Sequence, residues 1–202
     1  FARQFFYAKK GINKKRLFYF SRILYNKLCF KSEKEKIIER KGKIMEKKSR
    51  IIRGTSKCAR FFVCDTTELV KEAKKIHELD PIPARIFGEL LTATVMMGKD
   101  LKGENDLITV KINGDGPFGN MLTTSGKNGE VKGYVSGNPS EDIFKIIDEN
   151  GNFITDENGK IRFIGEGTLQ VIKDIGLKDP FSGVIKLESE EIADNIAYYF
   201  LL

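Results

Sequence analysis

The stretch that decides the fold is Ile82–Leu101, IPARIFGELLTATVMMGKDL. Pro81 and Pro83 open it, and proline is tolerated in the first turn of a helix because its missing N–H has no partner there. The apolar residues occupy more than one stripe of this helix: Ile86, Leu90, Ala93 and Met97 on one face, and Phe87, Leu91 and Thr94 on another. A helix that is apolar nearly all round is usually buried, so the sequence predicts a central helix against which other elements pack.

The same stretch does not have the composition of a membrane span. Arg85 and Glu89 fall inside it, and the uncharged run 90–98 is much shorter than the roughly 20 residues that a spanning helix needs. Gly88 and Ala93 are small, and they leave room for a sheet or a second helix to approach closely. We therefore expect the helix to lie at the centre of a globular domain.

Charge divides the chain into two parts. Residues 1–48 carry 16 Lys/Arg against 4 Asp/Glu, a net charge of +12, whereas residues 49–202 carry 19 against 24, a net charge of −5. These values sum to the +7 of the whole chain. The basic character therefore belongs to the first quarter, and the charge of the remainder gives no argument for binding nucleic acid.

Residues 1–48 are interpreted as a basic N-terminal extension outside the fold. Lys and Arg alternate there with aromatic and aliphatic residues, and no acidic residue precedes Glu33. This composition fits an amphipathic helix on a membrane, a transit peptide, or translated upstream sequence. We favour the last interpretation, because Met45 and the residues after it have the form of an ordinary bacterial start. A secretory signal is not expected, because the segment has no uncharged apolar core.

The cysteines are Cys29, Cys58 and Cys64, an odd number, and none belongs to a C-x-x-C pair. This pattern argues against a disulfide scaffold and against a zinc site within the chain, and it indicates a reducing cytoplasm. We interpret Cys58 and Cys64 as small apolar residues of a strand.

Residues 49–202 predict a single α+β domain with a largely antiparallel sheet around the central helix. We expect strands at 50–64 (one or two strands), 106–113, 120–125, 130–136, 168–174 and 183–187. Asn128-Gly129 is a strong hairpin signal, so the three strands that follow the central helix should form a meander.

Two further helices are predicted, one on each side of these strands. The first begins at Asp65 or Thr66, with Glu68 placed as in a capping box, and ends near Leu79. Its apolar face comprises Leu69, Ala73 and Ile76, with Val70 beside them. The second is capped by Ser189, with Glu190 and Glu191 against the positive end of its dipole. The chain reaches Leu202 inside this helix, and we expect a truncation there.

Residues 138–166 contain a short internal repeat, DENGNFIT and DENGKIRF, which starts at Asp148 and Asp156. We interpret it as two Asn-Gly turns that flank a hairpin. A calcium loop would need acidic residues at more alternate positions and a final glutamate.

Two motifs were considered as catalytic or binding sites. The segment 114–119, GDGPFG, fits G-x-G-x-x-G, but a strand and not a helix is predicted after it, so we interpret it as a turn whose φ angles require glycine. His77 is the only histidine, and without a nucleophile motif it is interpreted as a half-buried structural residue. No catalytic, cofactor-binding or metal-binding residue is assigned, and the domain is not expected to be an enzyme.

Three runs of the sequence resemble the N-terminal domain of the redox-regulated thirty-three-kilodalton chaperonin family. They are RGTSKCARFFVCDTTELVKEAKKIHELDPIPA, GELLTATVMMGKDLKGENDLITVKINGDGPFGNMLTTSGKNGEVKGYVSGNP and TLQVIKDIGLKDPFSGVIKLESEEIADNIAYYF. The resemblance covers about Ser49 to Leu202, and the motifs stand in the family order. No residue that resembles the family precedes Met45, which favours the upstream interpretation of the extension.

The resemblance implies an ATP-independent holdase of the bacterial cytoplasm that binds unfolding client proteins under oxidative and heat stress. Members of the family have an α+β core domain, a helical linker and a C-terminal zinc module with C-x-C and C-x-x-C. Oxidation forms disulfides in that module, expels zinc and exposes apolar surface, because thiolates hold zinc and disulfides do not. Neither Cys58 nor Cys64 matches those cysteines, so zinc is expected only in the full-length protein. The family allows a homodimer, and client-binding residues are not assigned.

Two other classes of function stay open. A small-molecule enzyme domain would need a pocket with convergent polar groups. A nucleic-acid or membrane binder would depend on residues 1–48, and deletion of that segment would abolish its binding. The chaperone interpretation predicts instead that the segment is dispensable.

Overall fold

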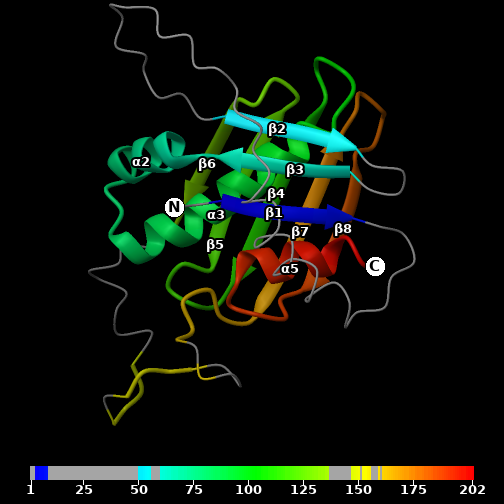
Figure 1. The fold of residues 1–202 in the computed structure, drawn as a ribbon. Helices are drawn as coiled ribbons and strands as arrows, with labels where there is room; N and C mark the ends of the chain where they lie inside the picture. Colours follow the sequence, from blue (N-terminus) through cyan, green and yellow to red (C-terminus); the bar gives the residue numbers. More distant parts are fainter. Residues whose placement is uncertain are drawn as a thin grey trace, which may run out of the picture.

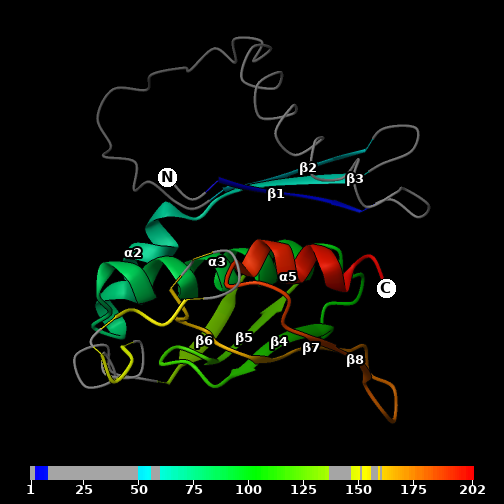
Figure 2. The same cartoon turned by 90° about the horizontal axis from the view of Figure 1, so that it is seen from below.

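The structure is a computed structural model that describes residues 3–8, 50–55, 60–136, 147–150, 152–155, 159 and 161–202. Its elements form three layers, with a five-stranded sheet on one side, helices in the middle and a three-stranded sheet on the other side (Figures 1 and 2). This arrangement confirms the predicted α+β class with a largely antiparallel sheet.

Helix α3, Pro81–Gly98, lies between the two sheets. On one side Phe87 and Leu90 belong to the large core that it shares with the five-stranded sheet. On the other side Val95 and Met96 pack against Cys64 of the three-stranded sheet. Contact with a sheet on each side explains why the helix is apolar nearly all round, and it confirms the predicted central helix.

The five-stranded sheet is antiparallel throughout, with the order β6-β5-β4-β7-β8. Its strands are β4 (Leu107–Gly114), β5 (Asn120–Gly126), β6 (Val131–Val135), β7 (Gly167–Asp174) and β8 (Phe181–Lys186). The predicted meander is therefore confirmed as β4-β5-β6. Alternate residues such as Val110, Ile112 and Leu169 face the helices and are fully buried, as expected for a sheet with one covered face.

The three-stranded sheet has the order β1-β3-β2 and comprises β1 (Arg3–Ala8), β2 (Arg50–Thr55) and β3 (Arg60–Asp65). The predicted strand region 50–64 is thus a hairpin of two strands. Residues 1–48 were expected to lie outside the fold, whereas the backbone of β1 pairs with β3 in antiparallel register. The rest of the extension falls outside the described residues, so the domain boundary stays a prediction.

Helix α2, Thr67–Ile76, begins after Thr66 as predicted but ends before the predicted Leu79. The Thr66 hydroxyl does not cap the helix, because it is buried and lies 2.7 Å from that of Thr92 on α3. The Asp65 carboxylate instead accepts the backbone N–H of Thr67 at 3.2 Å. At the other end the helix stops at Ile76, which is 67% exposed and therefore does not belong to the apolar face that we predicted.

The residues after α2 explain this difference. Glu78 has a φ of 51°, a left-handed conformation that reverses the direction of the chain. Leu79 after the turn is buried in the core, whereas Ile76 is exposed. Leu69 and Ala73 pack against this core as predicted, while being only partly buried.

Helix α5, Ile192–Tyr199, lies beside α3 in the middle layer (Figure 2). Ile192 and Ile196 are fully buried in the core. Near its C-terminal end the ring of Tyr199 rests on Gly183 of β8, where an added Cβ would lie 2.8 Å from the ring. The helix is therefore packed both on α3 and on the last strand of the sheet.

The first copy of the internal repeat forms a turn, as predicted. Ile147 and Phe153 form an isolated bridge, and between them the Asp148 carboxylate accepts the backbone N–H of Asn150 at 2.9 Å and of Asn152 at 2.8 Å. A second bridge joins Thr155 to Ile161. Asp156 and the residues 137–146 lie outside the described residues.

The burial of α3 leads to a stability prediction. Leu90 is 0% exposed, so Leu90→Ala should lower the free energy of unfolding by about 2–5 kcal/mol through lost burial and a cavity. Ile82 on the same helix is 46% exposed, and Ile82→Ala is the matched control. Urea unfolding of both variants measures the difference, and a loss well below about 1 kcal/mol for Leu90→Ala would contradict the buried position of α3.

Candidate functional site

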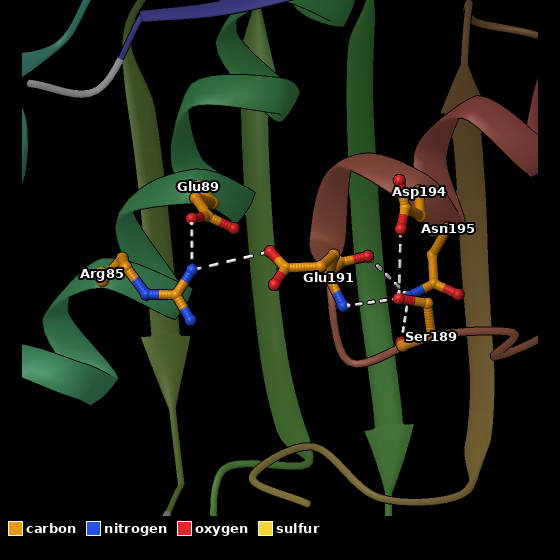
Figure 3. Close-up of polar contacts among 6 residues, drawn as sticks. All are labelled: Arg85, Glu89, Ser189, Glu191, Asp194 and Asn195. Carbon is orange, nitrogen blue, oxygen red and sulfur yellow. Dashed lines mark hydrogen bonds and ion pairs between the residues drawn. The ribbon is translucent and has the colours of Figure 1, made fainter. Parts of the chain in front are cut away.

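Polar side chains cluster where α5 begins beside α3 (Figure 3). The Arg85 guanidinium lies 2.9 Å from the Glu89 carboxylate one turn along α3, and 3.6 Å from the Glu191 carboxylate at the start of α5. One guanidinium thus bridges carboxylates from two helices. This geometry is that of an ion pair which fixes the relative position of the helices.

The chain that leads into α5 is held by Asn195, which is fully buried. Its side-chain oxygen accepts the N–H of Glu188 at 2.8 Å, and its side-chain nitrogen donates to the carbonyls of Ser189 at 2.7 Å and Glu191 at 3.0 Å. Burial of a side-chain amide costs little free energy only when the amide forms its hydrogen bonds, and the Asn195 amide forms three. Asn195 therefore shapes the connection from β8 to α5.

Ser189 differs from its predicted role as the helix cap. The helix begins at Ile192, with Glu191 at the N-cap position and no side-chain capping bond. The Ser189 hydroxyl instead accepts the N–H of Glu191 at 3.0 Å and donates to the Asp194 carboxylate at 3.2 Å (Figure 3). The hydroxyl therefore orders the residues before the helix and also binds Asp194 in its first turn.

Glu190 also has a role that the sequence did not predict. Its carboxylate accepts the backbone N–H groups of Ile164 at 2.8 Å and Gly165 at 2.9 Å, so it binds the loop before β7 and not the helix dipole. Asp115 holds the next residue of the same loop by accepting the N–H of Glu166 at 2.7 Å. These two carboxylates connect the start of α5, the loop before β7 and the glycine turn after β4.

The electrostatics of the cluster are dominated by Glu89, whose side chain is only 16% exposed. Burial raises the pKa of Glu89, and the Glu191 and Asp194 carboxylates raise it further. Arg85 lowers this pKa through charge and a hydrogen bond but does not cancel the effect of burial. The ionised Glu89 is thus destabilised in the folded protein.

The chemistry available at this cluster is limited. Its members are carboxylates, an amide, a hydroxyl and a guanidinium. Within the described part of the chain, no group of three or more His, Cys, Asp or Glu side chains is arranged to hold a metal ion. The arrangement joins α3 to α5 and is suited to positioning rather than to bond-breaking.

The glycine motif at 114–119 forms a turn followed by strand β5, as predicted, but the reason given for its glycines is wrong. Positive φ among the described glycines occurs at Gly129, Gly159, Gly165 and Gly176, not within the motif. Gly116 is required by close approach, because an added Cβ would lie 2.5 Å from the carbonyl oxygen of Phe163. The Gly116 N–H donates to the Ile164 carbonyl at 2.9 Å, so this amide is already used within the protein and does not face a phosphate.

The remaining candidate residues have structural positions. His77 is half-buried, and its ring meets that of Phe87 edge-on with centroids 5.3 Å apart. Cys64 is buried in β3 between sheet and helix, as predicted, and burial together with the nearby Asp65 charge raises the pKa of its thiol to about 11. Cys58 lies outside the described residues.

One exposed feature is the face of the five-stranded sheet that no described helix covers (Figure 2). The strand register places one row of residues across this whole face: Tyr134, Leu122, Lys111, Gln170 and Val184. Tyr134 is 59% exposed and Val184 is 58% exposed. No client-binding residue was predicted from the sequence, although the alternation of residues along the predicted strands separates the two faces of the sheet.

The three-stranded sheet also exposes apolar side chains on its outer side. Ile52 is 63% exposed, and the ring of Phe61 lies against Gly54 and is itself partly open. Exposed apolar groups that gather on a sheet are typical of surfaces that bind other proteins. Within the described residues, no helix is both long and apolar enough to cross a membrane.

The fold and its surfaces define a class: an α+β domain built around one helix between two sheets, with apolar side chains on open sheet faces. A family model described as "Hsp33 protein" matches residues 49–202, and the chain therefore belongs to the Hsp33 family. The resemblance seen in the sequence is confirmed.

Several relatives carry the name 33 kDa chaperonin. The one from Clostridium perfringens strain SM101 is 43% identical over 146 residues, which are 70% of this chain and 43% of the relative. The one from Ruminiclostridium cellulolyticum is 42% identical over 142 residues, which are 70% of this chain and 46% of the relative. The chain thus spans a little less than half the length of these relatives.

A solved structure agrees with the sequence comparisons. The crystal structure of the 33 kDa chaperonin, a heat shock protein 33 homolog, from Thermotoga maritima matches with a TM-score of 0.61 and 33% sequence identity. The match covers 74% of this chain and 49% of that chain. The fold described here is therefore similar to that of an Hsp33 homolog.

The raised pKa of Glu89 predicts a pH dependence of stability. The Glu89 carboxyl binds its proton more tightly in the folded protein than in the unfolded chain. The protonated carboxyl therefore contributes stability at acidic pH, and this contribution is lost as pH rises through the folded-state pKa of Glu89. Glu89→Gln removes this loss. We expect the free energy of unfolding of Glu89→Gln to increase relative to that of the wild type as pH rises from acidic to neutral.

Urea unfolding at a series of pH values measures this gain. The control is Glu72→Gln, which removes one carboxylate from the exposed side of α2. A Glu89→Gln variant that loses stability relative to the wild type as pH rises would show that the ion pair with Arg85 outweighs the cost of burial.

Proposed function

We propose that this chain acts as an ATP-independent holdase that binds unfolding proteins. The match to the Hsp33 family over residues 49–202 is the observation that carries this proposal. The apolar side chains on the open sheet faces support it, because a holdase needs exposed apolar surface to hold partly unfolded chains. No catalytic role is proposed for any residue of the chain.

We also propose that redox regulation belongs to the full-length protein, through a zinc module outside this chain. Within the described residues, Cys64 is the free cysteine, and it is buried with its thiol pKa raised to about 11. A thiol that stays protonated at neutral pH reacts slowly with oxidants, since the thiolate is the nucleophile. Cys64 is therefore proposed to have a structural role.

The proposed partners are unfolded or partly unfolded client proteins in a bacterial cytoplasm. A homodimer through this domain is part of the proposal, and sedimentation of the chain at several concentrations tests it. Binding to nucleic acid or to a membrane is not proposed, since the excess of positive charge is confined to residues 1–48.

The holdase proposal predicts that the purified chain suppresses the aggregation of a thermally unfolded client without ATP. The suppression should be equal with dithiothreitol and with peroxide, and metal analysis should find no stoichiometric zinc. Light scattering of the client measures the effect. Strong activation by peroxide would show that Cys58 or Cys64 acts as a switch, and no suppression in either state would assign client binding to the part of the family outside this chain.

The domain assignment predicts that residues 1–44 are dispensable. Limited proteolysis should leave a stable fragment that begins near Met45, because the charge and composition of the extension differ from those of the domain. The fragment should keep the thermal stability and the holdase activity of the whole chain. A clear fall in melting temperature after removal of 1–44 would show that β1 contributes to the fold.

A further inference from the structure

We propose that the free edge of strand β8 binds client proteins by pairing with an extended segment of the unfolded chain. This inference rests on the proposed holdase function and names the surface and the kind of partner. Among the described strands, β8 has a neighbour on one side only, which is β7 (Figure 1). Its other side presents backbone N–H and C=O groups that an added strand can use.

The register identifies which backbone groups these are. The N–H of Leu187 donates to the Gly167 carbonyl at 2.9 Å, so residue 187 points toward β7. Because consecutive residues of a strand point their N–H and C=O groups to opposite sides, those of Gly183 and Ile185 also point toward β7. The groups of Ser182, Val184 and Lys186 therefore point to the free edge.

The side chains beside this edge indicate an apolar partner. Val184 is 58% exposed on the open face of the sheet, and Phe181 at the start of the strand is also 58% exposed. Phe181 and Val184 lie on opposite faces of the strand, so one face of an added strand would lie beside Val184 and the other beside Phe181, and apolar residues on each face would cover both. Extended apolar segments become available when a protein unfolds, so a client in that state fits the edge.

The short length of the edge favours a client over a second copy of this chain. The strand comprises six residues, Phe181–Lys186, of which three point outward. A stable protein interface needs about 20–30 residues on each side, so pairing of two β8 strands alone would be too small to hold a dimer. A short strand pairing is weak and reversible, as the release of a client requires.

The edges of β2 and β6 are less suitable. Strand β2 carries exposed Arg50 and Arg53, and charged side chains of this kind protect an edge from added strands. Strand β6 carries Lys132, an exposed lysine within the strand. Strand β8 has a lysine only at its last residue.

Amide exchange tests the pairing directly in the unmodified chain. The probe is a fluorescein-labelled peptide of alternating valine and threonine with a glutamate at each end, and the control is the same peptide methylated on alternate backbone amides. The first peptide should slow exchange at the amides of Ser182, Val184 and Lys186. The amides of Gly183 and Ile185 should be protected already, and the methylated peptide should change nothing. Unchanged exchange at the three outward amides would overturn the proposal.

A pair of substitutions separates backbone pairing from side-chain contact. Val184→Pro removes an N–H that the sheet does not use, and proline is tolerated at such an edge position. Val184→Thr keeps the N–H and the branched shape. Val184→Pro should weaken peptide binding about tenfold by fluorescence anisotropy, as expected from one or two lost hydrogen bonds. Val184→Thr should bind nearly as the wild type does.

Equal binding by both variants, with equal melting temperatures, would overturn the proposal. Protection of the three outward amides without peptide, rising with protein concentration, would also overturn it by assigning the edge to a second copy. Failure of the proposed holdase function can be distinguished from failure of the strand-pairing proposal. A chain that pairs with the peptide but does not suppress aggregation would refute the holdase function and leave the strand pairing standing, whereas suppression without protection would refute only the pairing.

Discussion

The structure depends on the burial of most of α3 between the two sheets. A helix in contact with sheets on opposite sides leaves little of its surface to water, and every buried hydroxyl that it carries must find a partner. Thr92 and Thr94 do so by donating to the carbonyls of Gly88 and Leu90. Their oxygens also meet the hydroxyls of Thr66, before α2, and Thr123, on β5. Polar contacts thus connect the central helix to its neighbours without admitting water.

The junction of α3 with α5 differs, because charged side chains make the contact there, at the edge of the core. Arg85 faces more than one carboxylate, and the most buried of these, Glu89, is destabilised when ionised. The junction is therefore fixed in geometry but not optimised for stability. The half-exposed Arg85 guanidinium reaches carboxylates on α3 and at the start of α5, which suits the ion pair to positioning. In this domain it sets where α5 lies, and α5 in turn packs on β8.

The sequence was sufficient to predict the main helices and strands. A helix or strand that is buried on one side or on both sides has a recognisable pattern of apolar residues along its sequence. The central helix, the meander and the last two strands were predicted from such patterns, and the family was recognised from its motifs. Details that depend on tertiary contacts were not predictable. Thr66 turns inward to Thr92 instead of capping α2, and Glu190 binds a loop distant in sequence. The open face of the sheet was missed because exposure is a property of the assembled layers.

The contact between Tyr199 and Gly183 has a consequence for the alignment of the sheet. A shift of β8 by two residues would bring the side chain of Phe181 or Ile185 under the ring, where only a hydrogen atom fits. A shift by one residue would turn the buried side chains of the strand outward. The ring of Tyr199 on the last helix therefore permits only one register of β8 against β7 and excludes the registers shifted by one or two residues.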